Sequence, residues 1–70
     1  MPADAVTVEK PKHPLHALAT FELRDYRRQL ERAIAYFDAR KPVSPARGDL
    51  QASLDAVVAE QEDRARLARA

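Results

Sequence analysis

The sequence predicts an all-α protein, an antiparallel two-helix hairpin over residues 15–70 with a flexible arm at residues 1–14. Two segments carry apolar residues at steps of three and four, the spacing that places side chains on one face of a helix. A short connection at residues 41–44, marked by Pro42 and Pro45, separates these segments. Because short connections join antiparallel neighbours, we expect the two helices to pack against each other.

The first helix is predicted over residues 20–41. Thr20 is a suitable N-cap, and positions 21–40 contain neither glycine nor proline. Arg40 and Lys41 stand where the negative end of the helix dipole favours cations, and Pro42 ends the helix. The apolar stripe consists of Leu23, Tyr26, Leu30, Ala33 and Phe37, widened by Ile34. We therefore expect Tyr26 to point into the core.

The second helix is predicted over residues 45–69. Ser44 is its expected N-cap and Pro45 its first residue, because proline is favoured at the first helical position. Gly48 weakens the first turns by about 1 kcal/mol relative to alanine, which leaves a start at Asp49 as an alternative. The apolar stripe consists of Leu50, Leu54, Val57, Val58, Gln61, Ala65 and Ala68.

The region before the helices is rich in proline. Pro2, Pro11 and Pro14 each remove a backbone donor, which favours a flexible arm. An alternative is that the extended-type run at residues 5–10 adds a strand to the sheet edge of a partner. Residues 14–19 are expected to form a short helical turn that places Leu15 and Leu18 over the start of the first helix.

Composition narrows the class of protein. The chain has 0 Cys, and 12 basic against 11 acidic residues leave a net charge of +1. This balance makes nucleic acid an unlikely partner, since such binders normally carry a basic excess. No segment resembles a signal peptide or a membrane span, so we expect a soluble, cytoplasmic protein with no membrane partner. Its alanine and arginine content is typical of proteins from bacteria with GC-rich genomes.

The first helix carries a cluster of basic residues, Arg24, Arg27, Arg28 and Arg32. One interpretation is an anion-binding strip, since arginine makes bidentate contacts with carboxylates and phosphates. The alternative is a solvated helix face. Spacing predicts pairs of Arg28 with Asp25 and with Glu31, which would partly neutralise that face.

Other chemical signals are weak. His13 and His16 have no further metal ligands nearby, and Glu60, Glu62 and Asp63 read as a solvated surface. The chain has 1 Gly, no cysteine nucleophile and no Ser/His/Asp arrangement. We therefore expect a protein that is not an enzyme and has no cofactor and no metal.

A hairpin of this size is expected to need a partner, because small domains bury little of their surface. The sequence favours completion of a four-helix bundle by dimerisation, or docking on a larger protein subunit. The expected contact residues are Phe21, Ile34, Tyr36 and Val58. The leading hypothesis is a non-catalytic helical interaction module, either a homodimer or an accessory subunit. The alternatives are a nucleic-acid-associated regulator that uses the arginine strip and a non-catalytic small subunit of an enzyme complex.

Overall fold

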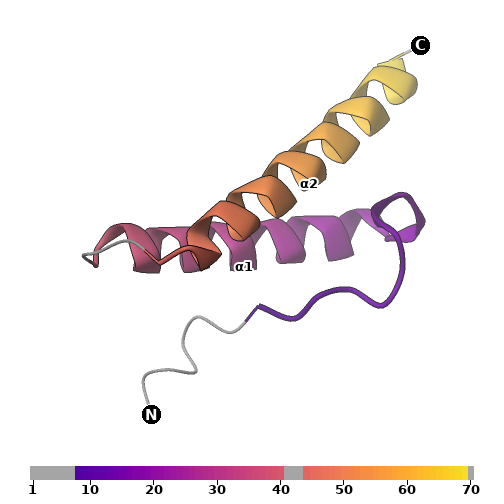
Figure 1. Ribbon diagram of the computed structural model, residues 1–70. Coiled ribbons are helices and arrows are strands. Elements are labelled where there is room, and N and C mark those ends of the chain that lie inside the picture. The colour runs from indigo at the N-terminus through magenta and orange to yellow at the C-terminus, as the bar shows by residue number, and fades with distance from the viewer. Residues whose placement is uncertain (1–7, 41–43, 70) are drawn as a thin grey trace.

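The computed structural model describes residues 8–40 and 44–69. Within these ranges the chain forms a short 3-10 helix, η2 (Leu15–Ala17), followed by two α-helices, α1 (Thr20–Asp38) and α2 (Ala46–Arg69). The two α-helices run in opposite directions and pack against each other, and no strand occurs in the described ranges (Figure 1). The predicted helical hairpin is confirmed. The chain is elongated, with principal extents of 44 × 20 × 15 Å.

The start of α1 differs by one residue from the prediction. Ala19, not Thr20, is the N-cap, with an extended backbone at φ −67° and ψ 157°. The Glu22 side chain reaches back, and its Oε1 accepts a hydrogen bond of 2.7 Å from the Ala19 N–H. A glutamate at the third helical position thus satisfies the N-cap amide, as in a capping box, and no side-chain oxygen is required at the cap itself.

The end of α1 also differs from the prediction, because the helix stops at Asp38 and not near residue 41. Arg40 folds back over the last turn: its Nη1 donates to the Tyr36 carbonyl at 3.0 Å, and its Cζ lies 3.4 Å from the centre of the Tyr36 ring. This side chain satisfies one of the carbonyls that every helix end leaves without a partner. The predicted turn lies largely at residues 41–43, outside the described residues.

The start of α2 agrees with the predicted capping residue. The Ser44 Oγ accepts a hydrogen bond of 3.2 Å from the Ala46 N–H, and the Ser44 carbonyl accepts one of 3.0 Å from Arg47. Ser44 therefore caps the helix, although the first helical residue is Ala46 and not Pro45. Gly48 lies inside the first turns, in open space.

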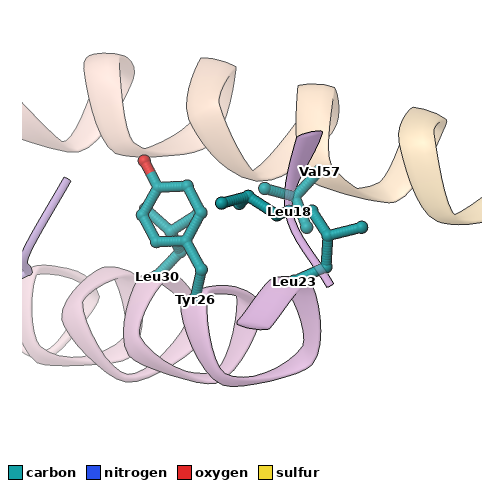
Figure 2. Packing of buried hydrophobic residues seen from close by; sticks show 5 residues of the cluster. All are labelled: Leu18, Leu23, Tyr26, Leu30 and Val57. Carbon is teal, nitrogen blue, oxygen red and sulfur yellow. The ribbon is translucent and has the colours of Figure 1, made fainter. Parts of the chain in front are cut away.

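The core lies between α1 and α2, closed at one end by the residue after η2. Its main cluster consists of Leu18, Leu23, Tyr26, Leu30 and Val57. Figure 2 shows the Tyr26 ring standing between the two helices, with its hydroxyl directed toward α2. Burying one such aliphatic side chain contributes about 1.5–3 kcal/mol. The predicted stripe on α1 is confirmed, since Ala33 and Ile34 are also buried, while Phe37 is only half-buried.

The stripe on α2 is only partly covered by α1. Val57 is its only buried member in the described chain, and Leu50 and Leu54 are partly buried. Ala65 and Ala68, which the spacing placed on the same stripe, are exposed. Figure 1 shows why: α2 crosses α1 obliquely, so its C-terminal end stands away from α1.

Residues 8–14, which we call the strap, have specific contacts on the hairpin. Val8 packs against the core, and the Glu9 N–H donates a 3.1 Å hydrogen bond to the Gln29 Oε1. The following turn is held by Arg64, whose Nη2 donates to the carbonyls of Leu15 at 3.2 Å and His16 at 3.3 Å. The structure thus provides contacts where the sequence predicted a flexible arm. Residues 1–7 lie outside the described chain.

Candidate interaction surfaces

The strap lies along one side of the helix pair and leaves the opposite side uncovered. It runs beside Gln29 and Tyr26 of α1 and Ser53 of α2. On the opposite side, Arg27 joins the two helices: its Nη1 donates to Gln61 Oε1 at 2.8 Å. We call this opposite side the open face.

The open face contains two of the predicted contact residues, Ile34 and Val58. Ile34 lies seven residues after Arg27, on the same side of α1. Val58 lies three residues before Gln61, on the same side of α2. Ile34 is only 8% exposed, because the hairpin itself covers it. Val58 is half-buried. A partner on this face would therefore meet Val58 more directly than Ile34.

The other two predicted contact residues lie elsewhere. Phe21 is 58% exposed and stands three and seven residues from Arg24 and Arg28, on the side of α1 turned away from α2. Tyr36 is half-buried and is covered by Arg40, and its ring meets Phe37 edge-to-face, with centroids 5.4 Å apart. The structure therefore divides the four predicted residues among different surfaces.

The predicted arginine strip is also divided. Arg27 is occupied by Gln61 and by Glu31, whose Oε2 lies 3.1 Å from the Arg27 Nε. The expected pairs of Arg28 with Asp25 and with Glu31 do not form; Glu31 is paired with Arg27 instead. Within the described residues, no ion pair involves Arg24, Arg28 or Arg32, and all three are exposed.

Most of the acidic residues of α1 bind groups other than these three arginines. Glu22 bonds the Ala19 amide, Glu31 pairs with Arg27, and Asp38 pairs with Arg47. The hydrogen bond from Arg47 lowers the pKa of Asp38; partial desolvation opposes this and the charge of Arg47 adds to it. Asp25 is the remaining carboxylate of the helix. The outer side of α1 therefore keeps a local positive charge.

One exposed apolar residue was missed by sequence reasoning. Leu67 is 75% exposed near the end of α2, more than any other large apolar side chain in the described ranges. The only sequence signal for it was its position outside the predicted apolar stripe. It belongs to the last turns of α2, residues 65–69, all of which are exposed.

Two shallow hollows border the strap, with volumes of about 360 and 310 Å³. Both are lined by Lys10, Tyr26 and Ser53. Lys10 and Asp49 are the charged residues of the larger hollow, and His13 lines the smaller one.

The acidic residues of α2 and a histidine that the sequence singled out are in ion pairs or exposed to solvent. Glu60 pairs with Arg64 at 2.9 Å, and Asp63 pairs with Arg66. His16 is exposed, and its carbonyl, not its ring, contacts Arg64. Over residues 8–40 and 44–69 there is no group of three or more His, Asp or Glu side chains that could hold a metal ion.

Comparison with protein-family models, with curated proteins and with solved structures finds no significant match to this chain. Neither α-helix has an apolar stretch of the length needed to span a lipid bilayer.

Proposed function

We propose that this protein is a non-catalytic helical protein–protein interaction module. It acts either as a homodimer, in which two hairpins form a four-helix bundle, or as an accessory subunit on a larger protein. The observation that carries the proposal is the poor coverage of α2. This helix has 24 residues, and Val57 is the only one that the described chain buries. A helix of that length normally buries an apolar stripe of its own along several turns.

The open face supports the proposal and suggests where the partner lies. The strap covers the other side of the seam, whereas Leu54 and Val58 remain partly exposed. The ion pairs at Arg27 and Arg47 border these apolar residues with polar groups. An apolar centre with a polar rim is the usual anatomy of an interface between proteins.

A subunit of an enzyme complex is a form of the same proposal with a larger partner. A nucleic-acid-associated regulator is the second candidate, favoured by the exposure of Arg24, Arg28 and Arg32. Three phosphate contacts on a chain of net charge +1 would give weak binding that salt abolishes. The protein interaction module therefore ranks first.

Sedimentation equilibrium over a wide concentration range tests the homodimer. We expect a reversible monomer–dimer equilibrium that Val58→Glu weakens, because it places a charge on the open face. Ala59→Glu is the matched control, since Ala59 is an exposed neighbour on α2. A folded, concentration-independent monomer would exclude the homodimer. Purification of the tagged chain from its own source would then have to yield a stoichiometric larger subunit, and recovery of the chain alone would reject the module altogether.

A further inference from the structure

We propose that the outer side of α1 is a docking surface for an acidic amphipathic helix of a partner protein. The surface consists of Phe21, Arg24, Arg28 and Arg32, which we call the basic ridge. The inference rests on the proposed interaction function and goes beyond it, because it specifies the charge and shape of what is bound. It also places this contact on a different surface from the open face.

The first argument is uncompensated charge. Arg24, Arg28 and Arg32 have no ion pair within the described residues, whereas the carboxylates of Glu22, Glu31 and Asp38 are bound to other groups. Asp25 is the one remaining carboxylate of α1, so the three arginines give the outer side of the helix an excess of positive charge. A surface of this kind attracts and orients an acidic partner.

The second argument is geometric. Arg24, Arg28 and Arg32 follow one another at steps of four, so successive positions are separated by about 6 Å along the axis, slightly more than one helical turn. A helix with acidic residues at the same step presents its carboxylates at the same interval. Each guanidinium can then make a bidentate contact with one carboxylate.

The third argument is the apolar residue at the end of the ridge. Phe21 is 58% exposed in the first turn of α1 and lies on the same side as Arg24 and Arg28. A large exposed aromatic ring beside arginines has the composition of a binding hot spot. The bound helix would therefore carry an apolar residue one turn beyond its acidic residues, where it covers the Phe21 ring.

The charge of the rest of the chain favours a protein over a nucleic acid. The described part of α2 carries Arg47, Arg64, Arg66 and Arg69 against Asp49, Asp55, Glu60, Glu62 and Asp63. Three of those arginines, Arg47, Arg64 and Arg66, are already in ion pairs. A polyanion extending past the basic ridge would thus find no second basic face on α2, whereas a single helix needs only the ridge.

Fluorescence anisotropy on the full chain provides the test. The probe is a labelled helical peptide of about 18 residues, with three glutamates at steps of four and a leucine one turn beyond them. At about 25 mM NaCl we expect saturable binding that falls steeply at about 250 mM, because exposed ion pairs are screened. Arg24→Glu with Arg28→Glu should weaken binding about tenfold or more.

The matched control is Arg66→Glu with Arg69→Glu, which changes the net charge equally on an exposed part of α2. It should leave the affinity within about twofold. Phe21→Ala should weaken binding and Leu67→Ala, the other large exposed apolar residue, should not. A peptide with lysines in place of the glutamates should bind the Arg24→Glu, Arg28→Glu variant. Circular dichroism checks helicity, and glutamine replaces glutamate at both positions if helicity is lost.

Three outcomes would overturn the inference: no peptide binding at low salt, equal weakening by both double variants, or tighter binding of a single-stranded DNA 20-mer than of the peptide. Sedimentation of the Arg24→Glu, Arg28→Glu variant separates this inference from the proposed function. If self-association persists while the peptide does not bind, only the basic ridge is wrong. If the peptide binds a strictly monomeric chain, the homodimer is wrong and the ridge stands.

Discussion

Arg47, in the first turn of α2, binds the carboxylate of Asp38, the last residue of α1, at both oxygens. The Arg47 Nε lies 2.6 Å from Oδ1 and the Nη2 lies 3.3 Å from Oδ2. Arg47 also donates from Nη1 to Gln51 Oε1 at 3.3 Å. This bidentate contact joins the end of one helix to the start of the next, on either side of the connection, and so holds the turn end of the hairpin together.

The pair makes stability depend on pH in a defined direction. The pKa of Asp38 is lowered in the folded state, chiefly by the hydrogen bond from Arg47. A carboxyl with a lowered pKa binds its proton more readily in the unfolded chain, so the stabilisation is present above the unfolded pKa and is lost as pH falls through the folded pKa. Asp38→Asn should lower the thermal midpoint at pH 7. Once the pH lies below the lowered pKa of folded Asp38, the two proteins should converge. Thermal melts followed by circular dichroism measure this, and a constant difference across the range would contradict the assignment.

Tyr26 is expected to stabilise the hairpin through its ring and not through its hydroxyl. The ring stands in the core, whereas the hydroxyl makes no hydrogen bond to the described residues. Tyr26→Ala should cost about 3 kcal/mol of unfolding free energy, as for other large aromatic truncations. Tyr26→Phe should stay within about 0.5 kcal/mol. Urea unfolding at fixed protein concentration decides this, and equal losses in both variants would mean that the hydroxyl matters.

Gly48 should be replaceable with a gain in stability. A Cβ added at this position meets nothing within 4 Å, and the residue is exposed in the first turns of α2. Gly48→Ala should therefore raise the unfolding free energy by about 0.5–1 kcal/mol through helix propensity and reduced freedom of the unfolded chain. The converse control is Ala52→Gly, one turn later on an exposed site, which should lower it by a similar amount. A loss of stability in Gly48→Ala would show that a contact forms there.

Arg64 should hold the turn before α1 onto α2. It donates to the carbonyls of Leu15 and His16 and pairs with Glu60, and the pair is less than a third exposed. Arg64→Ala should speed hydrogen exchange at the Leu18 amide, whose hydrogen bond to the Leu15 carbonyl closes η2, by about fivefold, equivalent to roughly 1 kcal/mol. Arg66→Ala, on the exposed side of α2, should leave that amide unchanged. If both variants behave alike, the turn does not depend on Arg64.

The structure also shows which of the predicted contact residues are suitable for testing an interface by mutation. Ile34→Glu would place a charge at a position that the hairpin already buries, so it would be expected to unfold the chain before it separated any dimer. Val58 and Phe21 are accessible and lie on different surfaces. They therefore probe the open face and the basic ridge independently.

The helices and the core side of α1 followed from the sequence because both depend on local spacing. Leu23, Tyr26 and Leu30 repeat at helical intervals, and a helix built on them has one apolar side whatever it packs against. The helix ends were less predictable. Glu22 caps Ala19 from inside the helix and Arg40 folds over Tyr36, so side chains several residues away set the boundaries.

The tertiary structure alone decided which surfaces are occupied. Spacing assigned Glu31 to Arg28, but α2 brings Gln61 to Arg27, and Arg27 then takes Glu31 as well. The oblique crossing of the helices likewise leaves the end of α2 uncovered, and the strap closes one face while the other stays open. A sequence by itself determines which side of each helix is apolar. The angle at which two such sides meet depends on contacts between residues far apart in the chain, and that angle determines what remains exposed for a partner.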